Sequence, residues 1–460
     1  MATMDFDLKI ESSTSGTVTL TSSPFEIKQY HSRYDDPETP TISETCNIRL
    51  KDGSVAANLD ELRTLRKLCK QAKDAQVDAN LGRVYLTFTE ASGGTAYRSE
   101  LKQAVTPWDL STLDYPHWTG DTQFATMSWE RANYWEGPEA QLALTNPNGT
   151  ANTSGLRVYN CNDGTVVDST YYQHNYVDVA GTAIGGELPS PTRLEMTNLH
   201  TETGDYKLAY LWIGQNWTNP STFTHYYEFV AGTAVADGDM GGGYFQQIGL
   251  NSGSEADIDT WTISAAQMAA AAGKYYKFII HTWTAAPIVH TSLRYRVRLE
   301  YNNWPIWESG YLSLDSSFGT SIRDLLAFKL PPWLNGLSNL GALDLVLRGY
   351  QASGVHKTVH LDYMQLLPLD GFRYIQAIST AGAGTNERIV DDGIERYTYQ
   401  DDGSGSDKRG FYATTGRAIH LYPGKNQRLY FMMHSTLLNE SKVSRKISVK
   451  LYYRPRRLSL

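Results

Sequence analysis

Residues 58–73 read Asn-Leu-Asp-Glu-Leu-Arg-Thr-Leu-Arg-Lys-Leu-Cys-Lys-Gln-Ala-Lys and predict one long amphipathic helix. The apolar positions recur at helical spacing and share one face: Leu59, Leu62, Leu65, Leu68, Cys69 and Ala72. The basic positions lie largely on the other face: Arg63, Arg66, Lys67, Lys70 and Lys73. Asn58 can cap the first turn, and Glu61, three residues later, completes the pattern of a capping box. Strand-like segments stand before and after the helix, so the sequence predicts a β-layer with one helix packed on it.

The composition is typical of a β-rich protein with partly apolar surfaces. The chain has 460 residues, enough for several domains of about 100–200 residues each. Aromatic residues make up 12%, with 30 Tyr and 11 Trp, while charged residues make up only 20%. The net charge is −8 and the basic residues are scattered, so we do not expect nucleic acid as a partner.

The cysteines and the apolar runs indicate where the protein is made. The chain has three cysteines, Cys46, Cys69 and Cys161, which is an odd number, and their spacing is not that of metal ligands. We therefore expect reduced thiols in a protein made in a cytosol, and no metal site. The N-terminus is polar, and no run reaches about 18 apolar residues. We therefore expect no signal peptide and no membrane insertion.

The sequence is mainly β, and its turn signals predict four segments. Residues 1–150 form strands around the helix, and residues 151–189 form a connecting segment that ends at Gly185-Gly186 and Pro189. Residues 190–370 contain repeated half-buried alternation, clearest over Arg294–Tyr301, and predict a β-sandwich of jelly-roll type with one short helix at 265–272. Residues 371–460 form a C-terminal β unit.

No catalytic motif is present, so we expect a protein that is not an enzyme and needs no cofactor. Asp362 alternates on a strand with His360, and we interpret it as a solvent-facing or loop-tethering carboxylate. His281 and His290 flank Trp283, and we interpret both histidines as surface residues.

The aromatic residues of the predicted jelly roll are candidates for glycan binding, because sugar rings stack their apolar C–H faces on flat aromatic rings. The candidates are Trp212, Trp217, Tyr226, Trp283, Trp304 and Trp307. The alternative is ordinary packing, since most tryptophans are substantially buried.

The dense basic cluster of the sequence lies at the C-terminus. It consists of Arg454, Arg456 and Arg457, directly after a predicted strand. Two interpretations stand: salt bridges to a neighbouring subunit, or a solvated chain end.

Three stretches resemble tailed-phage distal tail proteins and related minor tail proteins: Ser-Trp-Glu-Arg-Ala-Asn-Tyr-Trp-Glu-Gly at 128–137, Gly-Gly-Glu-Leu-Pro-Ser-Pro at 185–191, and Lys-Leu-Tyr-Tyr-Arg-Pro-Arg at 450–456. The resemblance implies a tail-tube-like β-sandwich for residues 1–150 and a carbohydrate-binding-like module for the jelly roll. Residues 371–460 then either pack back on 1–150, which makes the jelly roll an insertion, or stand alone.

The same resemblance implies a structural protein of the virion, made in the host cytoplasm. It would form a homo-oligomeric ring, with a hexamer favoured, at the distal tail or baseplate, next to other tail proteins and in contact with host glycans. The candidate interface residues are Arg63, Arg66, Lys67, Lys70, Arg454, Arg456 and Arg457. The alternatives are a tail-tube or capsid-decorating virion subunit, or a bacterial glycan-binding or glycan-active protein.

Overall fold

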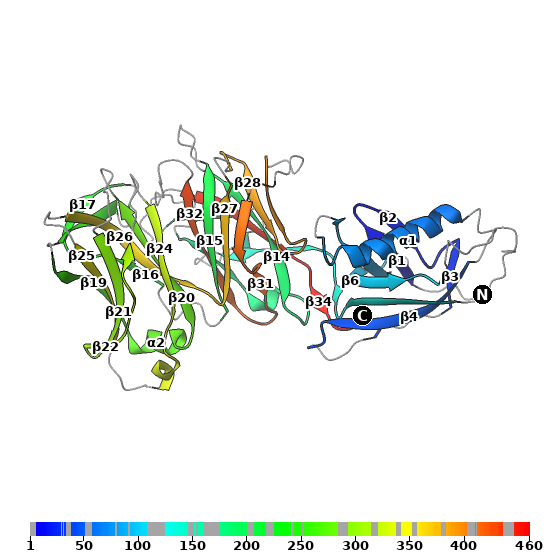
Figure 1. The fold of residues 1–460 in the computed structure, drawn as a ribbon, viewed down its shortest axis with the longest axis horizontal. Coiled ribbons are helices and arrows are strands. Elements are labelled where there is room, and N and C mark those ends of the chain that lie inside the picture. Colours follow the sequence, from blue (N-terminus) through cyan, green and yellow to red (C-terminus); the bar gives the residue numbers. More distant parts are fainter. Residues whose placement is uncertain are drawn as a thin grey trace. The chain divides into compact units, whose positions relative to one another are not determined.

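The fold is known from a computed structural model of the chain, which consists mainly of β-sheets (Figure 1). The structure describes residues 6–28, 30, 32–33, 38–50, 58–78, 81–90, 93–107, 125–145, 151–152, 155–160, 174–199, 207–217, 225–238, 240, 243–250, 253–283, 293–313, 321–336, 342–351, 357–378, 383–402, 410, 412–435 and 446–460. The chain forms two compact units. Unit 1 comprises Met1–Ala140, Gly185–Ser190 and Arg454–Leu460, and unit 2 comprises Gln141–Ile184 and Pro191–Tyr453.

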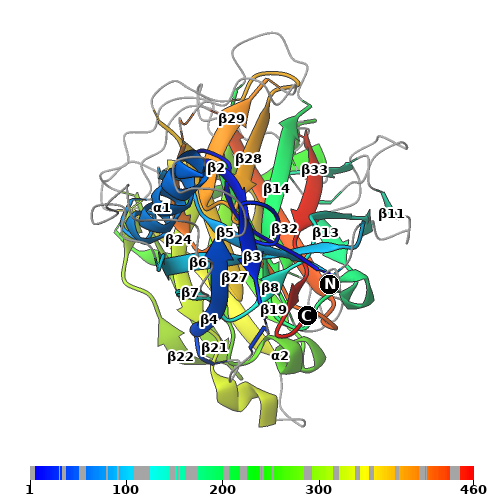
Figure 2. The ribbon, with the colours of Figure 1, turned by 90° about the vertical axis from the view of Figure 1, so that its right-hand side faces the viewer.

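Unit 1 is a curved antiparallel sheet that encloses an apolar core together with one helix. Its elements are β1 (Asp7–Ser12), β2 (Gly16–Thr19), β3 (Phe25–Ile27), β4 (Thr41–Leu50), α1 (Leu59–Asp74), β5 (Tyr85–Thr89), β6 (Ala96–Val105), β7 (Ala125–Ala132), β8 (Trp135–Glu136) and β34 (Arg456–Arg457). The strand order is β2-β1-β5-β6-β7-β4-β3, and β8 pairs with both β6 and β34. The helix lies against β1, β2 and β6 (Figures 1 and 2).

The predicted helix is confirmed, shifted by one residue at each end. Its buried residues include Leu62, Leu65 and Leu68, which share a core with strand residues such as Leu8 and Ile48. Burial of this leucine stripe is the main source of the helix's stability, because an isolated helix of this length is marginal in water.

The predicted capping box at the start of the helix was wrong. The Asn58 side chain makes no capping hydrogen bond, and its backbone has φ −109° and ψ 10° rather than the extended conformation that N-cap residues adopt. A buried residue that the apolar pattern missed is Gln71, whose Nε2 donates to Ser12 Oγ at 2.9 Å and to the Gly82 carbonyl oxygen at 3.0 Å. This amide ties α1 to the turns on either side of it.

Unit 2 contains two β-sandwiches, and the first combines segments that are far apart in the sequence. One sheet has the order β11-β10-β13-β32-β15-β27-β30, and the other has the order β12-β33-β14-β28-β29 with β9 and β31 attached. Their bounds are β9 (Ala140–Leu142), β10 (Leu144–Thr145), β11 (Ala151–Asn152), β12 (Leu156–Tyr159), β13 (Tyr176–Val179), β14 (Ser190–Asn198), β15 (Leu208–Asn216), β27 (Gly371–Ala377), β28 (Arg388–Asp392), β29 (Tyr397–Asp401), β30 (Tyr412–Gly416), β31 (His420–Leu421), β32 (Gln427–Ser435) and β33 (Lys446–Tyr453).

This pairing corrects the predicted segment boundaries. Residues 151–189 are more than a connection, because β12 and β13 pair with β33 and β32. Strands β14 and β15 also pair with these C-terminal strands rather than with the rest of the predicted jelly roll. Residues 371–453 therefore belong to the first sandwich of unit 2, and only the last residues of the chain belong to unit 1.

The second sandwich lies between β15 and β27 in the sequence. Its sheets have the orders β17-β18-β26-β20-β24, with β16 on β26, and β19-β25-β21-β22, with β23 on β21. The bounds are β16 (Tyr226–Glu228), β17 (Thr233–Ala236), β18 (Tyr244–Leu250), β19 (Glu255–Ile263), α2 (Ala265–Ala271), β20 (Tyr275–Trp283), β21 (Leu293–Tyr301), β22 (Trp304–Glu308), β23 (Leu312–Ser313), β24 (Ser321–Lys329), the 3₁₀ turn η4 (Pro332–Gly336), β25 (Leu343–Gln351) and β26 (Lys357–Pro368).

The alternation predicted for β21 is confirmed. Tyr295, Val297 and Leu299 point into the core that both sheets share, while Arg296 and Arg298 form ion pairs on the outer face. The short helix α2 is also confirmed, and it begins with a capping box between Ser264 and Gln267.

The interpretation of Asp362 and His281 as surface groups was wrong. Both side chains are fully buried, with His281 Nδ1 2.5 Å from Asp362 Oδ2. The sheet face that carries them is covered by the first sandwich, since the neighbouring Tyr363 hydroxyl donates to the Asn160 carbonyl oxygen at 2.5 Å. The alternation of a strand shows which residues share a face of the sheet. It does not show whether a segment distant in the sequence covers the face opposite the core. His290 lies outside the described residues.

Candidate functional site

The second sandwich of unit 2 carries a row of exposed tryptophans, which we call the aromatic stripe. It consists of Trp304 and Trp307 on β22 and Trp333 on η4. Their exposed fractions are 75%, 36% and 48%. Tryptophan is usually substantially buried, so three exposed rings on one sandwich need an explanation beyond packing.

A tight hairpin positions the two tryptophans of β22. Asn302 and Asn303 have φ angles of 49° and 63°, the left-handed conformation that two-residue β-hairpin turns need and that asparagine tolerates. The hairpin pairs Trp304 with Tyr301 and, after a shift in register, Trp307 with Leu299. Leu299 faces the core, so both tryptophans lie on the core-facing side of the sheet, on the strand that ends the sheet order.

Aromatic partners hold two of the three rings of the stripe, Trp307 and Trp333, in place. Trp307 stacks on Phe328 of β24, with ring centroids 5.5 Å apart and planes 21° apart. Trp333 meets Tyr301 edge-on at 6.0 Å, and the adjacent Leu334 is buried in the core. Trp307 and Trp333 therefore present large apolar rings that lose little conformational freedom when a ligand stacks on them.

The other predicted glycan candidates divide into buried and half-buried residues. Trp212 is buried and lies 5.1 Å from the ring of Tyr374, and Tyr226 is buried 4.7 Å from Tyr363. Neither ring is available for stacking on a ligand, because only 8% of Trp212 and 7% of Tyr226 is exposed. Trp217 is half-buried against Tyr422. The side chain of Trp283 lies outside the described residues.

Sequence reasoning missed Trp333. It follows Pro331 and Pro332 directly after β24, in a stretch without the alternation that marked the other candidates. A tryptophan just after a double proline, which stops the strand, is a local signal for a ring held outside the sheet.

The outer face of α1 in unit 1 is a second candidate surface. Arg63, Arg66, Lys67 and Lys70 are all exposed, as the helical pattern predicted. Arg63 pairs with Asp60 at 3.4 Å on the same helix. Within the described part of the chain, the other three have no ion-pair partner. The helix thus presents uncompensated positive charge.

The C-terminal arginines are used largely within their own unit. Arg456 forms an ion pair with Glu136 at 2.8 Å and lies over the ring of Tyr134, and Arg454 donates to the Gly137 carbonyl oxygen at 3.1 Å. Arg457 donates to the Tyr97 hydroxyl at 3.3 Å and remains exposed. The interpretation of a solvated chain end is therefore wrong for Arg454 and Arg456. An interface role for Arg454 or Arg456 would require breaking these contacts.

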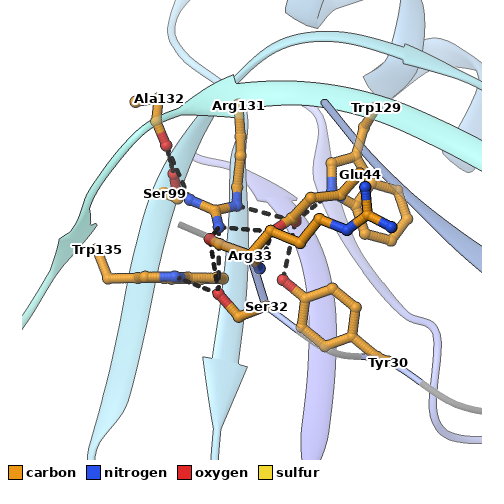
Figure 3. A network of polar contacts seen from close by, with 9 residues as sticks. All are labelled: Tyr30, Ser32, Arg33, Glu44, Ser99, Trp129, Arg131, Ala132 and Trp135. Carbon is orange, nitrogen blue, oxygen red and sulfur yellow. Dashed lines mark hydrogen bonds and ion pairs between the residues drawn. The ribbon is translucent and has the colours of Figure 1, made fainter. Parts of the chain in front are cut away.

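The segment Ser128–Gly137, which carries the resemblance to tail proteins, builds a buried polar network (Figure 3). Arg131 contacts Glu44 through two hydrogen bonds, Nε to Oε2 at 2.9 Å and Nη2 to Oε1 at 2.6 Å. Glu44 also accepts hydrogen bonds from the Trp129 indole at 2.9 Å and the Tyr30 hydroxyl at 3.0 Å. Burial alone would raise the pKa of Glu44, but the hydrogen bonds and the charge of Arg131 outweigh it and hold this pKa below its ordinary value.

The same segment fastens both ends of the polar loop that follows Tyr30. Arg131 Nη2 donates to the Arg33 carbonyl oxygen at 2.8 Å. At the other end, Asn133 Nδ2 donates to the Thr39 carbonyl oxygen at 3.1 Å, and its backbone N–H donates to Pro40 at 3.2 Å. This loop is therefore anchored at its two ends, and its residues 31 and 34–37 lie outside the described residues.

Neither a metal centre nor a membrane span is found where the structure describes the chain. No group of three or more His, Cys, Asp or Glu side chains there could hold a metal ion. No helix there has the length and apolar character needed to cross a membrane. Cys46 and Cys69 are buried, and Cys161 lies outside the described residues.

Comparison with known proteins identifies no family for the chain. No family model matches, and no curated protein matches. The chain is similar to a solved structure of infectious bursal virus derived T=1 particles, at 7% identity with 69% of this chain and 76% of that chain covered and a TM-score of 0.20. It is also similar to a chain of the phage P2 baseplate in its activated conformation with Ca, at 10% identity with 78% and 97% covered and a TM-score of 0.19. At such TM-scores these similarities carry no argument about fold or function.

Proposed function

We propose that this protein is a structural subunit of a tailed-phage tail. Unit 1 assembles into a ring at the distal tail or baseplate, and the second sandwich of unit 2 contacts host glycans. The support is the helix packed on the sheet of unit 1, together with the Ser128–Gly137 segment that resembles tail proteins. A tail-tube or capsid-decorating subunit would use the same fold in another place in the virion.

The observation that carries the assembly proposal is the uncompensated basic face of α1 on a protein whose net charge is −8. A closed ring needs a heterologous contact, in which one surface of a subunit meets a different surface of the next. A basic helix face on an otherwise acidic protein is complementary to the remaining surface of a second copy. Such complementarity sets the register of an interface and disfavours wrong contacts.

Particle mass in solution tests the assembly proposal, measured by mass photometry and followed by electron microscopy of the purified protein. We expect rings. The charge reversal Lys70→Glu is expected to shift the population towards monomer, because it places like charges across the contact. Lys28→Glu reverses an exposed charge elsewhere in unit 1 and is the matched control, expected to assemble as the unmodified protein does. A monomer at every concentration, or equal assembly of both variants, would contradict the proposal.

The glycan part of the proposal rests on the aromatic stripe. A screen of immobilised bacterial surface polysaccharides is expected to show binding that Trp304→Ala weakens by tenfold or more, since the stacked ring supplies the contact. Tyr397→Ala, which removes an aromatic ring that is 44% exposed on the first sandwich, is the control and is expected to leave binding unchanged. If a monomeric protein binds glycan through the stripe, a bacterial glycan-binding protein becomes the better description.

A further inference from the structure

The charged groups near the aromatic stripe face away from it. On β21 and β22, Arg296 pairs with Glu308 at 2.8 Å and Arg298 pairs with Glu300. These side chains lie on the outer face of the sheet, while Trp304 and Trp307 lie on the core-facing side. The ion pairs are therefore directed away from a ligand that stacks on the tryptophans.

The neighbouring strand β24 shows the same separation. Phe328 points inward and supports Trp307, while the next residue, Lys329, is exposed on the opposite face and lies over the ring of Tyr275. Arg323, a charged residue on the core-facing side of β24, precedes Phe328 by five positions, roughly 16 Å along a strand. Apolar residues next to the tryptophans in the sequence, Ile306 and Leu334, pack in or against the core.

We infer that the aromatic stripe binds uncharged sugar rings and discriminates against acidic polysaccharides, an inference that rests on the proposed glycan contact. A neutral pyranose offers C–H groups to the negative face of an aromatic ring. A uronic acid or sialic acid would bring a carboxylate next to that same negative face. Removing a carboxylate from water is costly without a basic partner. The described basic side chains Arg296, Arg298 and Lys329 face away from the stripe, and Arg323 lies roughly 16 Å along β24 from Phe328.

The same geometry determines how binding depends on salt. Contacts between charged groups weaken as salt screens them, whereas stacking and burial of apolar surface do not depend on opposite charges. Binding of a neutral glycan by the stripe is therefore expected to change by less than about twofold between low and high salt. Binding driven by Arg323 or by the outer ion pairs would fall steeply.

A matched pair of ligands tests the inference: an uncharged soluble glucan, and the same glucan after carboxymethylation. Affinity electrophoresis of the full-length protein in gels containing each polymer, at low and at high salt, gives four comparable retardations. We expect the neutral polymer to retard the protein at both salt concentrations. The carboxymethylated polymer is expected to bind at least tenfold more weakly than the neutral one. Trp304→Ala is expected to abolish retardation by the neutral polymer, and Arg323→Gln is expected to preserve it.

The outcomes separate this inference from the proposed function. Stronger retardation by the carboxymethylated polymer, or retardation that disappears at high salt, would overturn the preference for uncharged sugars while leaving glycan binding in place. If neither this pair nor the polysaccharide screen shows any binding, both the preference and the glycan contact are wrong.

Discussion

Arg131→Met is the perturbation that most directly tests the structural role of the Ser128–Gly137 segment. The Arg131 side chain is fully buried, and its guanidinium is the only positive group that contacts Glu44 among the described residues. The methionine side chain fills part of the same volume without charge. Glu44 then stays buried beside the Trp129 and Tyr30 donors without its counter-charge.

The expected decrease in the free energy of unfolding of Arg131→Met follows from this burial. Removing one partner of a buried ion pair destabilises a protein by about 3–5 kcal/mol, because the remaining charge is left uncompensated. The exposed fractions of the two side chains are 0% and 2%, so solvent screening does not reduce this figure. Arg49 and Glu26 form an ion pair at 2.6 Å on the neighbouring strands β3 and β4, with exposed fractions of 24% and 28%. Arg49→Met is the matched control and is expected to cost about 1 kcal/mol or less.

Hydrogen exchange measured by mass spectrometry reads out unit 1 separately from unit 2. Amide protons of β4 and β7 in Arg131→Met are expected to exchange roughly 100- to 4,000-fold faster than in the unmodified protein, since each 1.4 kcal/mol is about tenfold. Peptides from unit 2 serve as the internal reference. An acceleration no larger than that of Arg49→Met would refute the assignment of this network as a main source of stability.

The stability of unit 1 is expected to decrease at acidic pH. The pKa of Glu44 is held below its ordinary value of 4.5 in the folded state. The stabilisation it provides is therefore complete above that ordinary value and is lost as the pH falls through the lowered folded pKa. Exchange of β4 and β7 in the unmodified protein is expected to accelerate as the pH is lowered below about 4.5, beyond the intrinsic pH dependence of exchange. Glu44→Gln, which lacks the ionisable group, is expected to lose this part of the dependence.

Three further outcomes are expected. Leu65→Asp places a carboxylate in the core of unit 1 and is expected to abolish folding of that unit, whereas Lys67→Asp on the exposed face leaves it folded; circular dichroism and limited proteolysis separate the two. Ser264→Ala removes the capping box of α2 and is expected to cost about 0.5–2 kcal/mol, visible as faster exchange of the helix amides. Burial raises the pKa of the Cys46 and Cys69 thiols to about 12, so iodoacetamide at neutral pH is expected to label neither in the folded protein and both in denaturant; labelling of the folded protein would contradict the burial.

Local pattern predicted the elements well where one face of each is buried. The leucine spacing located α1 to within a residue, and the alternation in β21 identified the core-facing residues. These patterns succeed because the side-chain period of a helix or strand is a property of the backbone alone. The domain boundaries failed because β14 and β15 pair with strands more than 150 residues later, and no local signal records a distant partner.

The candidate sites show the same limit. Composition pointed to tryptophans as candidates, but the structure buries Trp212 and exposes Trp304 although both stand in strand-like surroundings. The difference is position in the sheet. Strand β15 is paired on both sides, whereas β22 is the last strand of its sheet. Edge position depends on strand order, which emerges only when the whole chain has folded.

The return of the chain to unit 1 explains how that unit keeps its fold although unit 2 interrupts it. The chain leaves unit 1 after Ala140, passes through it again at Gly185–Ser190 and rejoins it at Arg454. Beside the first and last of these points, the Gly137 N–H donates to the Pro455 carbonyl oxygen at 2.8 Å, and Arg456 pairs with Glu136. An insertion whose ends are held together in this way adds no open loop to its host, so a large module can be accommodated at low cost in chain entropy. Arg454 and Arg456 thus close unit 1 on itself.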